Sequence, residues 1–343
     1  MKLTIIRPDD CHLHVRSGEL LGDVVGYTAA QFGRAIIMPN LMPPIATVAQ
    51  AEVYREQIVS SLNEGVNFTP LMTLYLTDNT SVDEIKQAAA HPDIYAAKLY
   101  PAGATTNSDA GVSHVDRIFP LLEAMQAVDL PLLVHGEATA TEIDVFDREA
   151  VFIDKTLTVI RQRFPELRIV FEHITTQDAV DYVLAEDDKI AATITAHHLL
   201  LNRNHLLVGG IKPHNYCLPV LKRNTHQQAL ISAATSGNPK FFLGTDSAPH
   251  IQSAKESACG CAGCFTAIAA IEWYAEVFEQ AGALDKLEGF ASCFGADFYR
   301  LPRNSDTITL IKQPWQLPDN VTIGQQLAIP FQAGENLNWK LLG

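Results

Sequence analysis

The sequence predicts an α/β protein, a TIM (β/α)8 barrel with a C-terminal extension. Three observations indicate this fold: strand and helix patterns alternate along the chain, eight β/α units can be traced, and polar side chains recur where the strands end. The 343 residues suffice for a barrel, which typically contains about 250 residues, and for an added segment. Because no repeat or linker divides the chain, we expect one domain over residues 1–343, with a tail from about residue 300 packed on the barrel.

The first active-site strand is predicted at residues 10–16, after an apolar run and before the Ser17-Gly18 turn signal. In an extended segment alternate side chains share a face, so His12, His14 and Arg16 should point the same way. The other seven strands are apolar runs that end near proline, glycine or polar residues. They are expected at residues 34–40, 67–76, 94–100, 130–135, 167–173, 190–195 and 240–246.

Helices are predicted between these strands. The clearest start signal is Ser81 followed by Glu84, the pattern of a capping box. After the fourth strand, residues 101–111 are rich in small and polar residues and predict a long loop. Helices are expected from residue 20 and at 48–62, 81–92, 118–125, 149–164, 178–185 and 225–235, with two more near 265–281 and 285–298.

Composition excludes several classes of protein. The formal charge of −14 and the lack of a basic stripe argue against a nucleic-acid partner. No apolar run approaches the roughly 18 residues of a membrane span, so we expect no membrane insertion. The first residues lack the pattern of a secretory signal, and the six cysteines are expected to be reduced thiols. These features predict a cytoplasmic protein. Because the net charge is negative, an anionic substrate would need locally positive charge at its binding site.

Polar side chains at the strand ends are the strongest functional signal. The carboxyl ends of parallel barrel strands meet at one rim, where barrel enzymes carry their chemistry. A single histidine after a strand is commonly a hydrogen-bonded cap, but this many polar residues at equivalent places indicate a site. The residues are His12, His14, Asn40, Lys98, His135, His173 and Asp246.

Six of these side chains carry nitrogen or oxygen donors without a thiolate, which suits zinc or a similar divalent ion. Six donors exceed the four of one tetrahedral zinc, so we expect two metals. A charged ammonium cannot ligate a metal, which leaves three interpretations of Lys98: a bystander, an ion-pair partner, or a lysine converted by CO2 into a carbamate. Spacing alone does not choose among them.

Five segments of the chain resemble the amidohydrolase superfamily and, within it, the shorter, stand-alone bacterial dihydroorotases. The resemblance extends over essentially the whole chain. Its motifs are His12-Leu13-His14, the Lys98 segment Ala-Ala-Lys-Leu-Tyr-Pro-Ala-Gly, His135 in Val-His-Gly-Glu, His173 in Phe-Glu-His-Ile-Thr, and Asp246 in Gly-Thr-Asp-Ser-Ala-Pro-His.

The resemblance implies a binuclear zinc centre with two Zn²⁺ per subunit. One ion would be held by His12, His14, Lys98 and Asp246, and the other by Lys98, His135 and His173. Lys98 would be carboxylated by CO2 to N6-carboxylysine and bridge the ions. Asp246 would also be the catalytic proton shuttle. The family further suggests a homodimer.

The substrate implied by the resemblance is L-dihydroorotate, a cyclic amide with a carboxylate, opened reversibly to N-carbamoyl-L-aspartate in pyrimidine (UMP) biosynthesis. The resemblance assigns the carboxylate to Arg16, Asn40 and His250, and backbone contacts to Leu218 and Ala262. A guanidinium offers two parallel donors to a carboxylate, and Arg16 shares a face with His12 and His14, so the chemistry agrees.

Residues 101–111 directly follow the Lys98 strand and are expected to cover the site. Gly103 and Gly111 can absorb backbone rotation, and the hydroxyls of Thr105 and Thr106 carry no charge. An ordinary mobile loop is the alternative. The resemblance favours a loop that closes with both threonines on the substrate.

Two other clusters have simpler interpretations than metal binding. Residues 259–264 contain three cysteines among small residues, which favours a loop whose backbone approaches a ligand. His197 and His198 are adjacent, and on a strand they would point to opposite faces, so we expect them to form hydrogen bonds at the rim. Glu137 and Glu172 stand beside two of the ligand histidines and are candidates to hold them.

Two alternative functions stay open at this point. A hydantoinase or dihydropyrimidinase would share the metal centre but would not need a carboxylate clamp, so Arg16, Asn40 and His250 favour a dihydroorotase. A catalytically silent metal-binding scaffold is the second alternative. The complete ligand set, including Asp246, argues against it.

Overall fold

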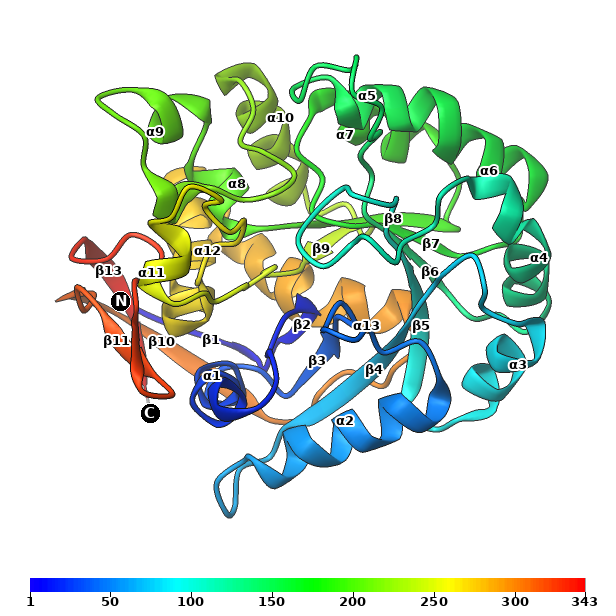
Figure 1. Ribbon diagram of the computed structural model, residues 1–343. Helices are drawn as coiled ribbons and strands as arrows, with labels where there is room; N and C mark the ends of the chain where they lie inside the picture. Colours follow the sequence, from blue (N-terminus) through cyan, green and yellow to red (C-terminus); the bar gives the residue numbers. More distant parts are fainter. Residues whose placement is uncertain (343) are drawn as a thin grey trace.

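An eight-stranded parallel sheet forms the centre of the computed structural model, which describes residues 1–342 (Figure 1). Each strand pairs with the next one along the chain, from β2 to β9. The sheet closes where the His14 N–H donates to the Ser247 carbonyl at 3.2 Å and the Asp246 N–H donates to the His12 carbonyl at 2.9 Å. The strands are β2 (Asp9–Leu13), β3 (Arg34–Ile37), β4 (Thr69–Tyr75), β5 (Ile94–Leu99), β6 (Leu132–Val134), β7 (Ile169–Phe171), β8 (Ile190–Ile194) and β9 (Phe241–Leu243). The predicted barrel is therefore confirmed.

Helices surround the barrel on its outer face (Figure 1). Most follow the predicted positions, because their buried apolar residues recur with helical spacing and pack on the strands. The predicted helix 149–164 contains a π-helical segment, η2 (Ile153–Leu157), between α5 (Arg148–Phe152) and α6 (Thr158–Arg163). The other outer helices are α1 (Glu19–Ala29), α2 (Val48–Ser60), α3 (Val82–Ala90), α4 (Phe119–Ala127), α7 (Gln177–Ala185), α10 (Asn224–Ala234) and α12 (Ala270–Gln280).

The capping box predicted at Ser81 forms only in part. The Ser81 hydroxyl accepts from the Glu84 N–H at 3.1 Å. The Glu84 carboxylate, however, accepts from the Val48 N–H at the start of α2, at 2.6 Å. A partner close in space thus replaces the reciprocal bond expected from the local sequence.

The barrel interior is packed with apolar side chains below the rim. One buried residue from each strand contributes to a single cluster, since alternate residues of a strand face the inside. The segment α13 (Phe294–Phe298), preceded by η5 (Leu284–Lys286) and η6 (Gly289–Cys293), supplies aromatic side chains to this cluster. The strand residues are Cys11, Ile36, Leu71, Ala96, Leu133, Val170, Ala191 and Phe242.

The two ends of the chain form a separate antiparallel sheet beside the barrel (Figure 1). β10 (Thr307–Gln316) lies between β1 (Lys2–Ile6) and β13 (Asn336–Leu341), and β11 (Val321–Ile323) pairs with β12 (Gln326–Ala328). The segment after residue 300 is thus mostly strand. Among residues 1–342, none of the helices has the length and apolar character needed to cross a membrane.

Candidate active site

Two histidines and one aspartate meet where β2 and β9 adjoin. The Nε2 atoms of His12 and His14 lie 3.5 and 3.1 Å from Asp246 Oδ1, and all three side chains are buried. Strand β2 ends at Leu13, so His14 and Arg16 follow the strand instead of continuing it to residue 16 as predicted. A bulge in the pairing of β2 with β3, between Asp10 and Leu13, accompanies this change.

Two further histidines stand beside this group. The His135 Nδ1 atom lies 3.2 Å from His173 Nε2, and the His173 ring centroid lies 4.9 Å from that of His12. The four imidazoles therefore form one continuous cluster at the carboxyl ends of β2, β6 and β7. Strand β5 contributes Lys98, whose fully buried Nζ has no hydrogen-bond partner among residues 1–342. This ammonium lies 5.0 Å from the centroid of the Tyr100 ring.

Electrostatics in the cluster suit cation binding. Burial lowers the pKa of His14 to about 4, which keeps its imidazole neutral at pH 7 and able to offer a lone pair. Burial opposes the charge of Asp246, but the hydrogen bond from His14 and the nearby histidines hold the pKa of its carboxyl well below the usual range. Burial also lowers the pKa of Lys98 to about 8. Neutral imidazoles and a carboxylate are donors that fit a divalent metal, and Lys98 could join them only after its positive charge is lost.

Carboxylates behind the histidines fix which ring nitrogen faces the cluster. Glu172 Oε2 lies 2.8 Å from His12 Nδ1, and Glu137 Oε2 lies 2.9 Å from His135 Nε2. A neutral imidazole that donates through one nitrogen presents a lone pair on the other, so His12 Nε2 and His135 Nδ1 are left as acceptors. The predicted support is confirmed for Glu137 and its neighbour His135, whereas Glu172 supports His12 and not the adjacent His173.

Asp10 and Glu149 anchor the backbone around the histidine cluster, and neither was predicted. Asp10 accepts hydrogen bonds from the His12 N–H at 3.1 Å and from the Thr245 N–H and hydroxyl at 2.9 and 2.6 Å. It therefore ties β2 to the segment that carries Asp246. Glu149 accepts from the backbone and hydroxyls of Thr175 and Thr176, just after His173. Asp10 shares a strand face with His12, which was an available signal, whereas nothing local marked Glu149.

Three predicted site residues have left-handed backbone conformations. The φ angles are 63° at Arg16, 39° at His173 and 45° at Asp246. Residues other than glycine adopt such angles only where the surrounding structure enforces them, and they gather at functional sites. Each of these residues lies within three residues of the end of a strand. The left-handed conformation therefore changes the direction of the chain where it leaves the strand at the rim.

A cavity beside the histidine cluster brings together the residues assigned to the substrate. Arg16 donates to the Pro249 carbonyl at 2.8 Å, and its Nη2 lies 3.0 Å from His250 Nε2. The same His250 nitrogen lies 3.0 Å from the Ala262 carbonyl. The cavity is lined by His14, Arg16, Asn40, Thr105, Thr106, Leu218, Asp246, Ala248, Ala262 and Gly263. His250 contacts this set without lining the cavity itself.

The loop at residues 101–111 lies against the site. The Asn40 side chain donates to the Thr106 carbonyl at 3.3 Å, and the Asn107 side chain donates to the Asn40 carbonyl at 3.0 Å. Gly103 has a φ of 75°, but Gly111 has an ordinary φ and instead leaves room for the Tyr100 carbonyl, which an added Cβ would meet at 2.4 Å. Close packing therefore explains the second glycine.

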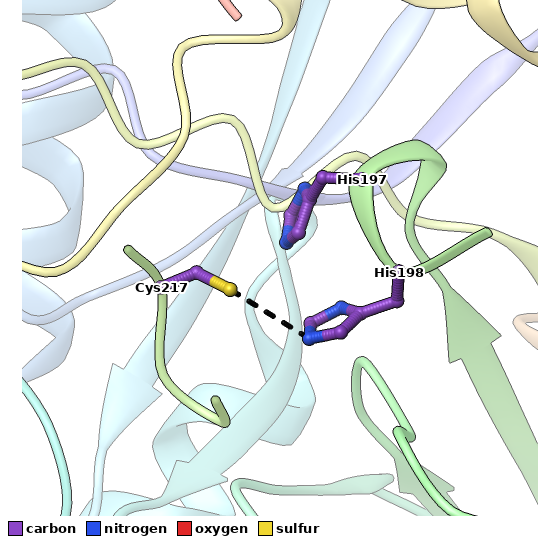
Figure 2. A group of neighbouring side chains, drawn as sticks. All are labelled: His197, His198 and Cys217. Atoms are coloured by element: carbon purple, nitrogen blue, oxygen red, sulfur yellow. Dashed lines mark hydrogen bonds between the residues drawn. The ribbon is translucent and has the colours of Figure 1, made fainter. Parts of the chain in front are cut away.

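His197 and His198 lie on a short helix and not on a strand, which corrects the prediction. Helix α8 (Ala196–Leu200) places their ring centroids 4.5 Å apart, with Cys217 beside them (Figure 2). His198 contacts the Thr195 hydroxyl at 2.8 Å and the Pro219 carbonyl at 3.0 Å through its two nitrogens. Because both nitrogens are engaged, His198 is a hydrogen-bonding residue as expected. His197 has no such partner among residues 1–342.

Comparison with known proteins assigns the chain to a family. Residues 4–330 match the Amidohydrolase family. A dihydroorotase of Ralstonia pickettii is 63% identical over 338 residues, which are 98% of each chain. A crystal structure of the Saccharomyces cerevisiae dihydroorotase in complex with 5-fluoroorotic acid superimposes with a TM-score of 0.93 at 35% identity, covering 99% of this chain and 98% of that one.

A hydantoinase shares the fold at much lower identity. The L-hydantoinase (dihydropyrimidinase) of Arthrobacter aurescens superimposes with a TM-score of 0.81 at 14% identity, covering 99% of this chain and 83% of that one. This likeness concerns the fold alone. The family match and the high identity over the full length show that the chain belongs to the dihydroorotases of the amidohydrolase family, which are metal-dependent cyclic amide hydrolases.

Proposed function

We propose that this dihydroorotase works with two zinc ions per chain. His12, His14, Lys98 and Asp246 would hold one ion, and Lys98, His135 and His173 the other. The observation that carries this proposal is the unpartnered Lys98 Nζ, buried beside a continuous cluster of four histidines and an aspartate. A single tetrahedral zinc uses four donors, and this rim offers six.

Lys98 in this proposal is carboxylated by CO2. A free ammonium in a cluster of metal ligands would repel the cations, whereas a carbamate would supply two anionic oxygens to both. Burial already disfavours the charged amine, because the pKa of Lys98 is lowered to about 8, and a neutral amine is the form that reacts with CO2. The carbamate would also satisfy the nitrogen that lacks a partner.

The substrate carboxylate is proposed to bind Arg16, Asn40 and His250, with backbone contacts from Leu218 and Ala262. The support is geometric, since Arg16 and His250 are in contact and Asn40, Leu218 and Ala262 line the same cavity. Arg16 forms no ion pair with a carboxylate among residues 1–342, so its charge is available to an anion. Thr105 and Thr106, which line the cavity from the loop, would bind the ring from above.

Asp246 is proposed to move the proton of the reaction. Hydrolysis adds water to the ring carbonyl and breaks the amide C–N bond, which yields a new carboxylate and the free ureido nitrogen of N-carbamoyl-L-aspartate. The Asp246 carboxylate would accept a proton from the attacking water and deliver it to the departing nitrogen. Bound divalent cations supply Lewis-acid polarisation and a more acidic water at such a centre. The low pKa of Asp246 keeps its carboxyl ionised before the reaction.

We further propose a cytoplasmic homodimer whose residues 1–343 form one domain. Pairing of β1 with β10 supports the single domain, because it joins the first and last segments of the chain beside the barrel. The six cysteines are free, which suits a reducing compartment. Sedimentation of the purified protein would test the dimer.

Metal analysis of active protein tests the central proposal. We expect two zinc ions per chain and loss of dihydroorotate ring opening when a chelator removes them. A stoichiometry of one in fully active protein would contradict the binuclear assignment, while the ring-opening activity itself would stand.

A further inference from the structure

Lys255 lies behind the wall of the substrate cavity and has no role in the site described so far. It ends the short helix α11 (Gln252–Lys255), and its side chain is only 3% exposed. Its Nζ donates to three backbone carbonyls: Tyr216 at 2.8 Å, Cys261 at 2.7 Å and Gly263 at 2.8 Å. An ammonium has three N–H donors, so these contacts use its whole capacity.

These carbonyls belong to the two segments that carry the proposed backbone contacts. Cys261 and Gly263 flank Ala262, and Tyr216 precedes Leu218 by two residues. The Gly263 N–H also donates to the Tyr216 carbonyl at 2.9 Å, which joins the segments directly. Gly263 has a φ of 145° and leaves no space for a Cβ, which would meet the Ala248 carbonyl at 2.6 Å. The segments are therefore held in one arrangement around Lys255.

The contact with Cys261 sets the direction of the Ala262 N–H. In a trans peptide the C=O of one residue and the N–H of the next point in opposite directions. Because the Cys261 carbonyl points at Lys255, the Ala262 N–H points away from it. This N–H has no hydrogen-bond acceptor within the described part of the chain, and Ala262 lines the cavity. A free donor thus stands at the cavity wall.

Charge supports the same interpretation. Lys255 makes no ion pair with a carboxylate among residues 1–342, and neither does Arg16. A buried cation without a carboxylate partner is costly, so proteins retain it where another anion will bind or where it fixes structure. Here both positive side chains adjoin the cavity proposed for an anionic substrate.

We propose that Lys255 is a positioning residue for substrate binding: it holds residues 261–263 and the Tyr216 segment so that backbone N–H groups face the substrate carboxylate, and it adds positive charge behind them. The proposal rests on the proposed carboxylate site. It predicts that loss of the ammonium impairs binding of dihydroorotate more than turnover, because Lys255 touches neither the ligand cluster nor the scissile amide.

The test compares Lys255→Met with Lys240→Met. Lys240 is a matched control, because its Nζ also donates to two backbone carbonyls, those of Val183 and Glu186, but it precedes β9 at the other end of the barrel. We expect Lys255→Met to raise KM for dihydroorotate about 10- to 100-fold, the usual effect of losing hydrogen bonds to a charged group. Its kcat should change much less, and its metal content should stay at the wild-type level. Lys240→Met should lower the melting temperature and leave KM unchanged.

Several outcomes would overturn the proposal. An unchanged KM in folded Lys255→Met would do so, as would a fall in kcat alone or an equal rise of KM in Lys240→Met. If Lys255→Met does not fold, Lys255→Gln retains two amide donors and should show a smaller rise of KM. The variant Arg16→Gln separates the two proposals. An unchanged KM in Arg16→Gln would contradict the carboxylate site. A raised KM in Arg16→Gln together with an unchanged KM in the Lys255 variant would overturn only the role of Lys255.

Discussion

Charged side chains are paired differently at the two ends of the barrel. At the amino-terminal end, Arg34 makes two hydrogen bonds to the Asp9 carboxylate, at 3.0 and 2.6 Å. Arg168 donates to the Asp129 carboxylate at 2.7 Å and to the Phe298 carbonyl at 2.7 Å. These guanidinium groups, 12% and 9% exposed, meet a carboxylate at close range, as charges largely removed from water in stable proteins usually do.

At the carboxyl-terminal end, several buried polar atoms have no partner within residues 1–342. They include Lys98 Nζ, His173 Nδ1, Glu137 Oε1 and Glu172 Oε1. Leaving such atoms unpaired costs stability unless a ligand satisfies them. The comparison teaches that charges at the amino-terminal end are paired within the protein, while the rim keeps polar atoms whose bonding capacity is unused. Changes at the two ends should therefore separate activity from stability.

The largest effect is expected from Lys98→Ala. It removes the proposed bridge between the ions, so most ring-opening activity and at least one metal should be lost. In metal-free protein, where no carbamate forms, the free energy of unfolding should not fall, because the variant removes an amine that is buried without a partner. Metal analysis and denaturant unfolding of the same preparation would check this. Addition of a small carboxylic acid should restore part of the activity, and full activity without it would refute the carbamate.

Asp246→Asn should have the next largest effect. The amide keeps the shape of the side chain but cannot carry a proton, so kcat should fall by roughly 10²–10⁴. Steady-state kinetics would measure this, with metal content determined in parallel. A loss confined to KM would mean that Asp246 only binds.

Arg34→Met tests the opposite end of the barrel. It leaves the buried Asp9 carboxylate without its guanidinium partner, so the free energy of unfolding should fall by about 3 kcal/mol. The Asn304 side chain still donates to Asp9 at 2.8 Å and should limit the loss. The kcat/KM of the folded variant should equal that of the wild type, and a clear change in kcat/KM would show that the two ends are coupled.

The double variant Thr105→Ala, Thr106→Ala should have the smallest effect. Both residues line the cavity from the loop, so kcat/KM should fall about tenfold, the amount expected from losing one or two hydrogen bonds. Metal content and melting temperature should match the wild type, because the hydroxyls act on the substrate only. Wild-type kinetics in the double variant would show that the loop only connects its neighbouring elements and does not bind the substrate through these hydroxyls.

Much of the fold followed from the sequence because its signals are local. Apolar runs of strand length, such as the one before Lys98, and helices with buried residues at helical spacing are set by period and by turn residues. The location of the site at the rim could also be predicted from the sequence, since parallel barrel strands bring their carboxyl ends together whatever the loops between them. His12, His135, His173 and Asp246 were therefore identified by their positions near the carboxyl ends of strands, and the motifs around them identified the family.

Tertiary structure decided what distant contacts control. The Glu84 carboxylate binds the start of α2 instead of completing the cap of its own helix. Asp10 and Glu149 hold the segments around the histidine cluster through partners far away in the chain, and Lys255 donates to the distant Tyr216 carbonyl. Local sequence does not reveal such partners. The sequence determines which residue types lie at the rim. The orientation of their side chains depends on hydrogen bonds between distant segments, because only closure of the barrel brings these segments together.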